Sequence, residues 1–322
     1  MRVVGGRIVE TNGVELFVRE AGPPDGPVVV LSHGFPELSY SWRHQIPVLA
    51  DAGYHVLAPD QRGYGRSSRP DGIEQYDIVH LADDLLGLLD DVDAESATFV
   101  GHDWGAILVW QMSVMHPARV DAVTGISVPF QRRGPSPPIA RMRERFAGVF
   151  FYILYFQEPG VADAELNADP SSTMRRMLSI GTATPAPSDA FAALAEDGRG
   201  FLERLPEPDR LPTWLTDLEF DVYVDAFTRT GFSGPLNWYR NFDRNWQLTA
   251  HLDGAKVEVP SLFIGGADDP VLIVTPPSVM DGWVTDHRGS ILLEGAGHWL
   301  QQERPAEVNA ALLDFLGTVT PT

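Results

Sequence analysis

The pentapeptide from Gly101 to Gly105 constrains this chain more than any other segment, and it reads Gly-His-Asp-Trp-Gly. It stands between a β-like apolar run at residues 97–100 and a helical stretch from Ala106 to His116. Small residues on both sides allow a sharp strand-to-helix turn, which lifts the middle side chain clear of a sheet. The pattern therefore predicts a nucleophile elbow with Asp103 as the nucleophile.

An aspartate at this position restricts the chemistry. A serine that attacks an sp³ carbon would leave an ether, which a histidine-activated water cannot cleave. A carboxylate leaves an ester, which is open to hydrolysis at its carbonyl. Asp103 therefore points to an alkyl electrophile, such as an epoxide or an alkyl halide, rather than to an ester or amide.

The composition is that of a globular protein. The chain has 322 residues, 44% hydrophobic and 21% charged, so it can bury a large core. Its net charge of -20 repels polyanions, so we expect neither nucleic acid nor an anionic membrane as a partner. The lack of cysteine excludes disulfides and thiolate chemistry. We expect a cytoplasmic location, because residues 1–6 hold no signal-like apolar stretch and no window approaches a transmembrane span.

Strand and helix signals alternate along the first third of the chain, which predicts an α/β fold with a mostly parallel sheet and helices on both faces. We expect an N-terminal hairpin that turns at Asn12-Gly13. Further strands are expected at 28–31, 55–58, 120–128, 261–265 and 290–293, and helices at 81–91 and 305–316.

The alternation stops between Gln131 and about Trp246, where helix-like segments are broken by many prolines. This pattern indicates an insertion, which we expect to be a mainly helical cap. The predicted division is a core domain of residues 1–130 and 247–322, interrupted by a cap domain of residues 131–246.

An aspartate nucleophile needs a base that activates water, and the base needs an acid that holds its tautomer. After a nucleophile elbow, the acid and then the histidine follow in the chain. Among nine histidines, His298 fits that order, in a glycine-rich loop after the last strand signal. Both Asp268 and Asp269 follow the strand before it. We favour Asp269 as the acid, with Asp268 as a helix cap or a solvated side chain.

Two further kinds of donor are expected. Ester hydrolysis passes through an oxyanion, for which the Phe35 N–H, after the first parallel strand, and the Trp104 N–H are the candidates. Epoxide opening needs a donor for the emerging alkoxide, and a phenol with a pKa of about 10 stays protonated at neutral pH. The predicted cap offers Tyr152 or Tyr155 and Tyr239, although aromatic residues at such spacing more often pack in a core.

These motifs together resemble the α/β-hydrolase-fold epoxide hydrolases. The resemblance is collinear over nearly the whole chain and rests on residues 33–37, 60–65, 101–105, 152–160, 237–241 and 297–299. It implies the α/β-hydrolase fold, a triad of Asp103, Asp269 and His298, and Tyr152 and Tyr239 as the two ring donors. Residues 60–65 are expected to shape a loop and its ion pairs.

The resemblance implies hydrolysis of an epoxide to a vicinal diol through an ester on Asp103, without a metal or cofactor. The expected partners are water and a small lipophilic epoxide, and relatives often associate, which leaves a homodimer open. A haloalkane dehalogenase is one alternative, but it usually carries His-Gly-Asn-Pro where this chain has His-Gly-Phe-Pro, and it lacks the tyrosine pair. A non-catalytic receptor on this fold is the other, and it would be expected to have a damaged triad.

Overall fold

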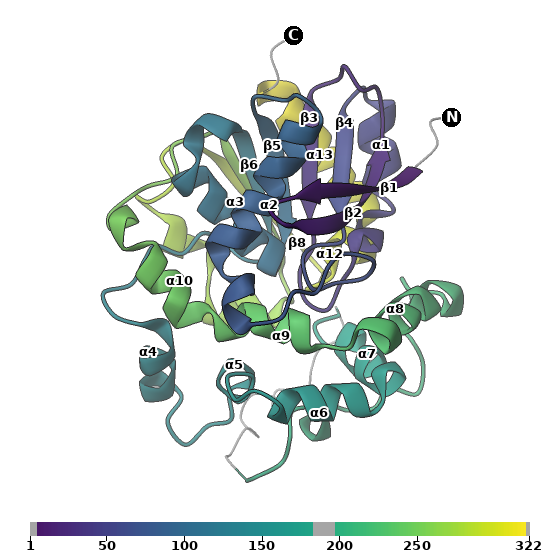
Figure 1. Cartoon of the computed structure of the whole chain (residues 1–322), viewed down its shortest axis with the longest axis vertical. Helices are drawn as coiled ribbons and strands as arrows, with labels where there is room; N and C mark the ends of the chain where they lie inside the picture. Colours follow the sequence, from purple (N-terminus) through teal and green to yellow (C-terminus); the bar gives the residue numbers. More distant parts are fainter. Residues whose placement is uncertain (1–4, 183–196, 320–322) are drawn as a thin grey trace.

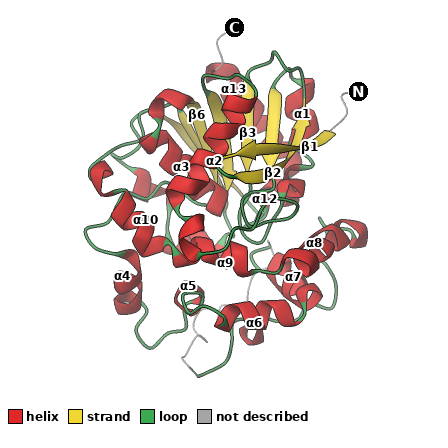
Figure 2. Cartoon of the chain, in the orientation of Figure 1, coloured by secondary structure: helices red, strands yellow, loops and turns green. Residues whose placement is uncertain are grey.

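The computed structural model describes residues 5–182 and 197–319. Within these residues, one sheet has the strand order β1-β2-β4-β3-β5-β6-β7-β8 (Figures 1 and 2). β1 and β4 each pair with β2 antiparallel, and all other neighbours pair parallel. The predicted mostly parallel sheet is therefore confirmed. The strands are β1 (Gly5–Thr11), β2 (Val14–Ala21), β3 (Val28–Ser32), β4 (His55–Pro59), β5 (Ala97–His102), β6 (Val120–Ile126), β7 (Ser261–Gly266) and β8 (His287–Leu293).

The central strands are apolar along their length because both of their faces are covered. Val30 and Phe99 belong to an apolar cluster on one face of the sheet, and Val29 and Val100 belong to a second cluster on the other. The first cluster includes side chains of α2 (Ile78–Asp91) and α3 (Trp104–Met115), and the second includes side chains of α1 (Ile46–Asp51), α12 (Leu300–Glu303) and α13 (Pro305–Val319).

The N-terminal hairpin forms as predicted. Asn12 and Gly13 have positive φ values of 47° and 74°, as a two-residue type I′ turn requires. Thr11 pairs with Val14 directly across this turn. The hairpin places two antiparallel strands at one edge of the otherwise parallel sheet.

Between β6 and β7 the described chain is mainly helical. Its helices α4 to α9 lie below the sheet in Figure 1, on the side away from both chain ends. They join the rest of the chain through the first apolar cluster, which includes Met174 and Phe227 of the insertion. The division into a core and a cap domain stays a prediction. The helices are α4 (Pro138–Arg145), α5 (Tyr152–Tyr155), α6 (Val161–Ala168), α7 (Pro170–Ser179), α8 (Asp217–Thr230), α9 (Ser233–Arg240) and α10 (Phe242–Leu248).

The loops hold several short elements. A helix α11 (Pro270–Val274) follows β7 directly. Six single turns of 3-10 helix lie at Ser39–Trp42, Ile73–Tyr76, Pro117–Arg119, Leu202–Arg204, Ala250–Leu252 and Pro277–Met280 in the described chain. Over residues 5–182 and 197–319, no helix combines the length and the apolar character that crossing a bilayer requires.

Candidate active site

Asp103 lies at the carboxyl end of β5, in the sharp turn that leads into α3. Its φ of 53° and ψ of -118° fall where residues other than glycine are rarely found. The turn is so tight that it needs glycine at both flanking positions. A Cβ on Gly101 would lie only 2.2 Å from the Gly105 oxygen. A Cβ on Gly105 would in turn lie 2.0 Å from the Ser32 oxygen. The chain thus has the shape that the pentapeptide predicts.

The two oxygens of the Asp103 carboxylate have different surroundings. Oδ1 accepts a hydrogen bond of 2.8 Å from the Phe35 N–H, and the Trp104 N–H also donates to this carboxylate. Oδ2 lies 3.8 Å from Nε2 of His298, which is too far for a direct hydrogen bond. The two main-chain donors expected from the sequence therefore converge on Asp103, and one oxygen is left facing the histidine.

His298 and Asp269 are in contact, although they follow different strands. Nδ1 of His298 lies 3.0 Å from Oδ2 of Asp269, whose side chain has no exposed surface. Burial lowers the pKa of His298, but the carboxylates of Asp269 and Asp103 outweigh burial and raise that pKa to about 9. The imidazole of the resting site is therefore mainly protonated at neutral pH.

Asp269 also caps the helix that follows it, which is one of the two roles expected of Asp268. Its Oδ1 accepts a hydrogen bond of 2.9 Å from the Val271 N–H, which makes Asp269 the N-cap of α11. Asp268 is exposed. The expectation of Asp268 as a cap is therefore wrong, and its alternative of a solvated side chain is right, because one carboxylate has two oxygens and can serve both partners.

Tyr152 and Tyr239 lie close together on α5 and α9, with ring centroids 6.1 Å apart. Burial raises the pKa of each phenol above its usual value, and the negative charge of Asp103 raises it further. Both phenols are therefore protonated at neutral pH and can donate. The Tyr155 hydroxyl instead bonds to Glu165; burial and this bond raise the pKa of Tyr155 to about 12.

A buried ion pair links the elbow to the two loops beside it. Glu37 Oε2 lies 2.6 Å from Nδ1 of His102, and neither side chain is exposed. Nε2 of His102 donates to the His298 carbonyl at 2.8 Å. Burial opposes the charged form of Glu37, but the charge of His102 outweighs it and lowers the pKa of Glu37 to about 2. The pair thus ties the loop at Gly34, which also donates to Glu37, to the His298 loop.

The comparisons with known proteins agree on one family. Residues 27–305 match the family described as alpha/beta hydrolase fold. The chain is 61% identical to Epoxide hydrolase A of Mycobacterium tuberculosis over 313 residues, which are 96% of both chains. The chain belongs to the α/β-hydrolase-fold epoxide hydrolases. A crystal structure of Epoxide Hydrolase A from Mycobacterium thermoresistibile, 57% identical, has a TM-score of 0.95 and covers 99% of both chains.

A more distant epoxide hydrolase shows how much of a longer relative this chain spans. It is 41% identical to Bifunctional epoxide hydrolase 2 of Mus musculus over 317 residues. That match covers 97% of this chain and 55% of the mouse protein. The shared part includes the elbow, the histidine loop and the helical insertion.

The motifs at residues 33–37 and 60–65 form hydrogen bonds that hold loops in place. Arg62 donates to Asp84 through Nε and Nη2, at 2.8 and 2.6 Å, as expected for the loop at residues 60–65. Nε2 of His33 accepts from the Gln61 N–H at 3.0 Å, so His33 supports a loop. Glu37 was not expected to have this role, since it stands out in the sequence only as a member of the motif at residues 33–37. A charged residue within an apolar loop was the available signal, but nothing in the sequence pairs it with His102.

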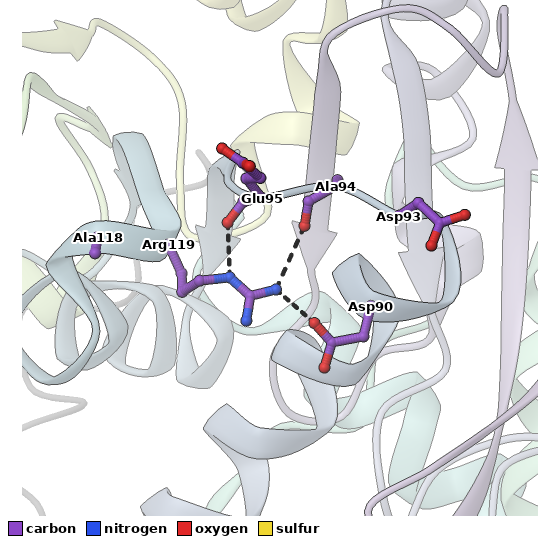
Figure 3. Close-up of a pocket in the computed structure, with 6 residues that line it drawn as sticks. All are labelled: Asp90, Asp93, Ala94, Glu95, Ala118 and Arg119. Atoms are coloured by element: carbon purple, nitrogen blue, oxygen red, sulfur yellow. Dashed lines mark hydrogen bonds and ion pairs between the residues drawn. The ribbon is translucent and has the colours of Figure 1, made fainter.

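A surface pocket of this epoxide hydrolase has a separate lining, made of Asp90, Asp93, Ala94, Glu95, Ala118 and Arg119 (Figure 3). Its lining precedes β5 and β6, so it lies at the amino ends of strands whose carboxyl ends carry the site. Arg119 crosses it and donates to Asp90 at 2.6 Å and to the Glu95 oxygen at 2.7 Å. This arginine connects two loops, and the pocket contains no residue that the sequence analysis selected.

Proposed function

We propose that this epoxide hydrolase converts a small lipophilic epoxide to a vicinal diol through a covalent ester on Asp103. The observation that carries the proposal is the asymmetry of the Asp103 carboxylate. One oxygen is held by N–H donors and the other faces His298, with two protonated phenols close to the same carboxylate. This arrangement supports nucleophilic attack followed by hydrolysis.

In the first step, Oδ2 of Asp103 attacks a ring carbon from behind. A carbon–oxygen bond to Asp103 forms while the ring carbon–oxygen bond breaks. The departing oxygen takes a proton from Tyr152 or Tyr239, whose raised pKa keeps that proton available for a strong base only. The phenolate then recovers its proton at the expense of the His298 imidazolium.

Ester formation itself prepares the base for the second step. The negative charge of Asp103 is one of the causes of the raised His298 pKa, and the ester has no such charge. The pKa of His298 therefore falls once the intermediate forms. A neutral imidazole, held by Asp269, can then accept a proton from water.

In the second step, water attacks the carbonyl carbon of the Asp103 ester. The developing charge on Oδ1 is stabilised by the Phe35 and Trp104 N–H groups. His298 passes one water proton to the departing Oδ2 and takes up the other. The bond between the carbonyl carbon and Oδ2 breaks, which releases the diol and restores the carboxylate and the imidazolium.

The surroundings of the tyrosines support an apolar substrate. The Tyr152 ring lies 5.5 Å from the Phe156 ring and 6.0 Å from the Phe201 ring. The Tyr239 ring lies 5.4 Å from the Phe35 ring. We propose that residues 131–246 act as a cap that brings these rings over the strand ends. The cytoplasmic location stays a prediction, and a homodimer stays open.

A trapping experiment tests the mechanism. His298→Gln should form the ester and hydrolyse it slowly, because only the second step uses the base. Intact-mass analysis should show an adduct of the substrate mass on the peptide that carries Asp103, and Asp103→Ala should show none. Diol formation by folded Asp103→Ala, with host enzyme excluded, would contradict the ester. Bromide release from alkyl bromides without turnover of any epoxide would favour the dehalogenase.

A further inference from the structure

The segment after α7 contacts the main chain of the proposed base. The His298 N–H donates to the Gly181 oxygen at 2.5 Å. The indole N–H of Trp299 donates to the neighbouring Ile180 oxygen at 2.9 Å. Ile180 and Gly181 belong to the insertion between β6 and β7, whereas His298 and Trp299 follow β8. Two hydrogen bonds thus join the insertion to the loop that carries the base.

This contact requires glycine on both sides. A Cβ on Gly297 would lie 1.6 Å from the Gly181 oxygen. Gly181 itself has a φ of 67°, and a Cβ there would lie 2.9 Å from the His298 Cβ. A side chain at position 181 would therefore strain the backbone and press on the base.

The core holds His298 by its other groups. Its carbonyl accepts from His102 and from the Ser127 hydroxyl, each at 2.8 Å, and its ring contacts Asp269. The His298 N–H is the group that the insertion holds. The position of the base relative to Asp103 therefore depends on both parts of the chain.

We propose that Gly181 is a positioning residue for His298, which sets the distance from the base to the Asp103 ester. This inference rests on the proposed function, because it assigns His298 to the hydrolytic step. Ring opening uses Asp103 and the tyrosines. A displaced His298 should therefore slow ester hydrolysis and spare ester formation.

The test separates the two steps by rapid mixing of full-length enzyme with styrene oxide. In Gly181→Ala, ester hydrolysis should fall by about tenfold or more, since small misplacements in an active site can cost about a hundredfold. Ester formation should stay within about twofold of wild type, so the ester accumulates. Trp299→Phe removes the second hydrogen bond and should change the same step in the same direction, by a smaller factor.

Gly198→Ala is the matched control. Gly198 also lies in the insertion and has a φ of 82°, but no atom of residues 5–182 or 197–319 is found within 4 Å of a Cβ built there. It reports backbone strain without pressure on His298, and both of its steps should remain near wild type. Circular dichroism and thermal unfolding establish which variants are folded. If Gly181→Ala does not fold, Trp299→Phe tests whether the contact with the insertion positions His298.

Ester formation by the wild-type enzyme distinguishes a failure of the proposed function from a failure of the positioning role of Gly181. If wild type forms no ester on Asp103, the proposed function fails. If wild type forms the ester but folded Gly181→Ala hydrolyses it at the wild-type rate, the positioning role is overturned. It is also overturned if formation and hydrolysis fall by the same factor, which is the result expected of a purely structural residue.

Discussion

Tyr152 and Tyr155 are three residues apart on the same short helix, yet their hydroxyls have different electrostatic partners. The charge of Asp103 acts on Tyr152, whereas Tyr155 bonds to Glu165. Proximity to Asp103 is what would allow a phenol to donate to the ring oxygen of a substrate that Asp103 attacks. The pair therefore gives a sharp test of the donor assignment.

We predict that Tyr152→Phe and Tyr239→Phe each slow ester formation more than its hydrolysis. Loss of one transition-state donor typically costs about a hundred- to a thousandfold, and each single change should fall below that range because the other phenol remains. The double variant should form almost no ester in pre-steady-state mixing. Tyr155→Phe is the control and should form the ester at the wild-type rate.

The opposite pattern would reassign the donor. If Tyr155→Phe slows ester formation while Tyr152→Phe does not, the assignment within α5 is wrong. If none of the three changes matters, the phenols are packing residues and the ring oxygen has another donor.

At the level of single residues, the sequence supports some assignments better than others. Asp103 and His298 are selected by local motifs and chain order, and the structure brings them within 3.8 Å. The choice between Tyr152 and Tyr155 is different, since composition alone offers both. The double task of Asp269 depends on where α11 begins relative to His298, which is a three-dimensional fact.

Among the helices, α2 is capped by Asp77, which also forms an ion pair with a residue of the insertion. Oδ1 of Asp77 accepts hydrogen bonds of 3.1 Å from the N–H groups of Val79 and His80. Oδ2 accepts a bond of 2.8 Å from Arg244 of α10. One carboxylate thus caps a core helix and binds a helix of the insertion.

We predict that Asp77→Ala lowers the free energy of unfolding by about 1 kcal/mol, which is the usual contribution of an N-cap. The ion pair to Arg244 adds little, because this arginine is half exposed. Urea unfolding measures the change. Asp83→Ala, within the same helix, is the control and should differ from wild type by less than about 0.5 kcal/mol. Equal effects of the two substitutions would remove the capping role.

The ends of elements were harder to predict than the elements themselves. The strand expected at 120–128 ends at Ile126. Ser127 then adopts a φ of 67° and its hydroxyl bonds to the His298 carbonyl. That partner lies far away in the sequence, so the apolar pattern, which continues to Val128, holds no sign of the break.

For the molecule as a whole, the charge of His298 couples the site to stability. Its pKa in the folded protein is about 9, against an ordinary value of 6.5. The resulting stabilisation is fully present below about pH 6.5 and is lost as the pH rises through about 9. Since one pKa unit corresponds to about 1.4 kcal/mol, up to about 3 kcal/mol is involved.

We predict that the free energy of unfolding falls as the pH rises from about 6.5 to about 9, and that His298→Gln removes most of this fall. Burial lowers the pKa of His33, His44 and His287, so their effect on stability is complete by about pH 6.5. Guanidinium unfolding at a series of pH values provides the measurement. The same slope in wild type and His298→Gln would show that another group is responsible.

The apolar cluster shared by the sheet and the insertion has a consequence for protein engineering. Phe99 of β5 and Phe227 of α8 belong to one cluster, so apolar packing is continuous across this junction. A segment with such a junction is a poor interchangeable module. Chimaeras that exchange residues 131–246 between relatives would have to carry the matching side chains of α2 and α3 with them, or accept cavities and overlaps where the two halves meet.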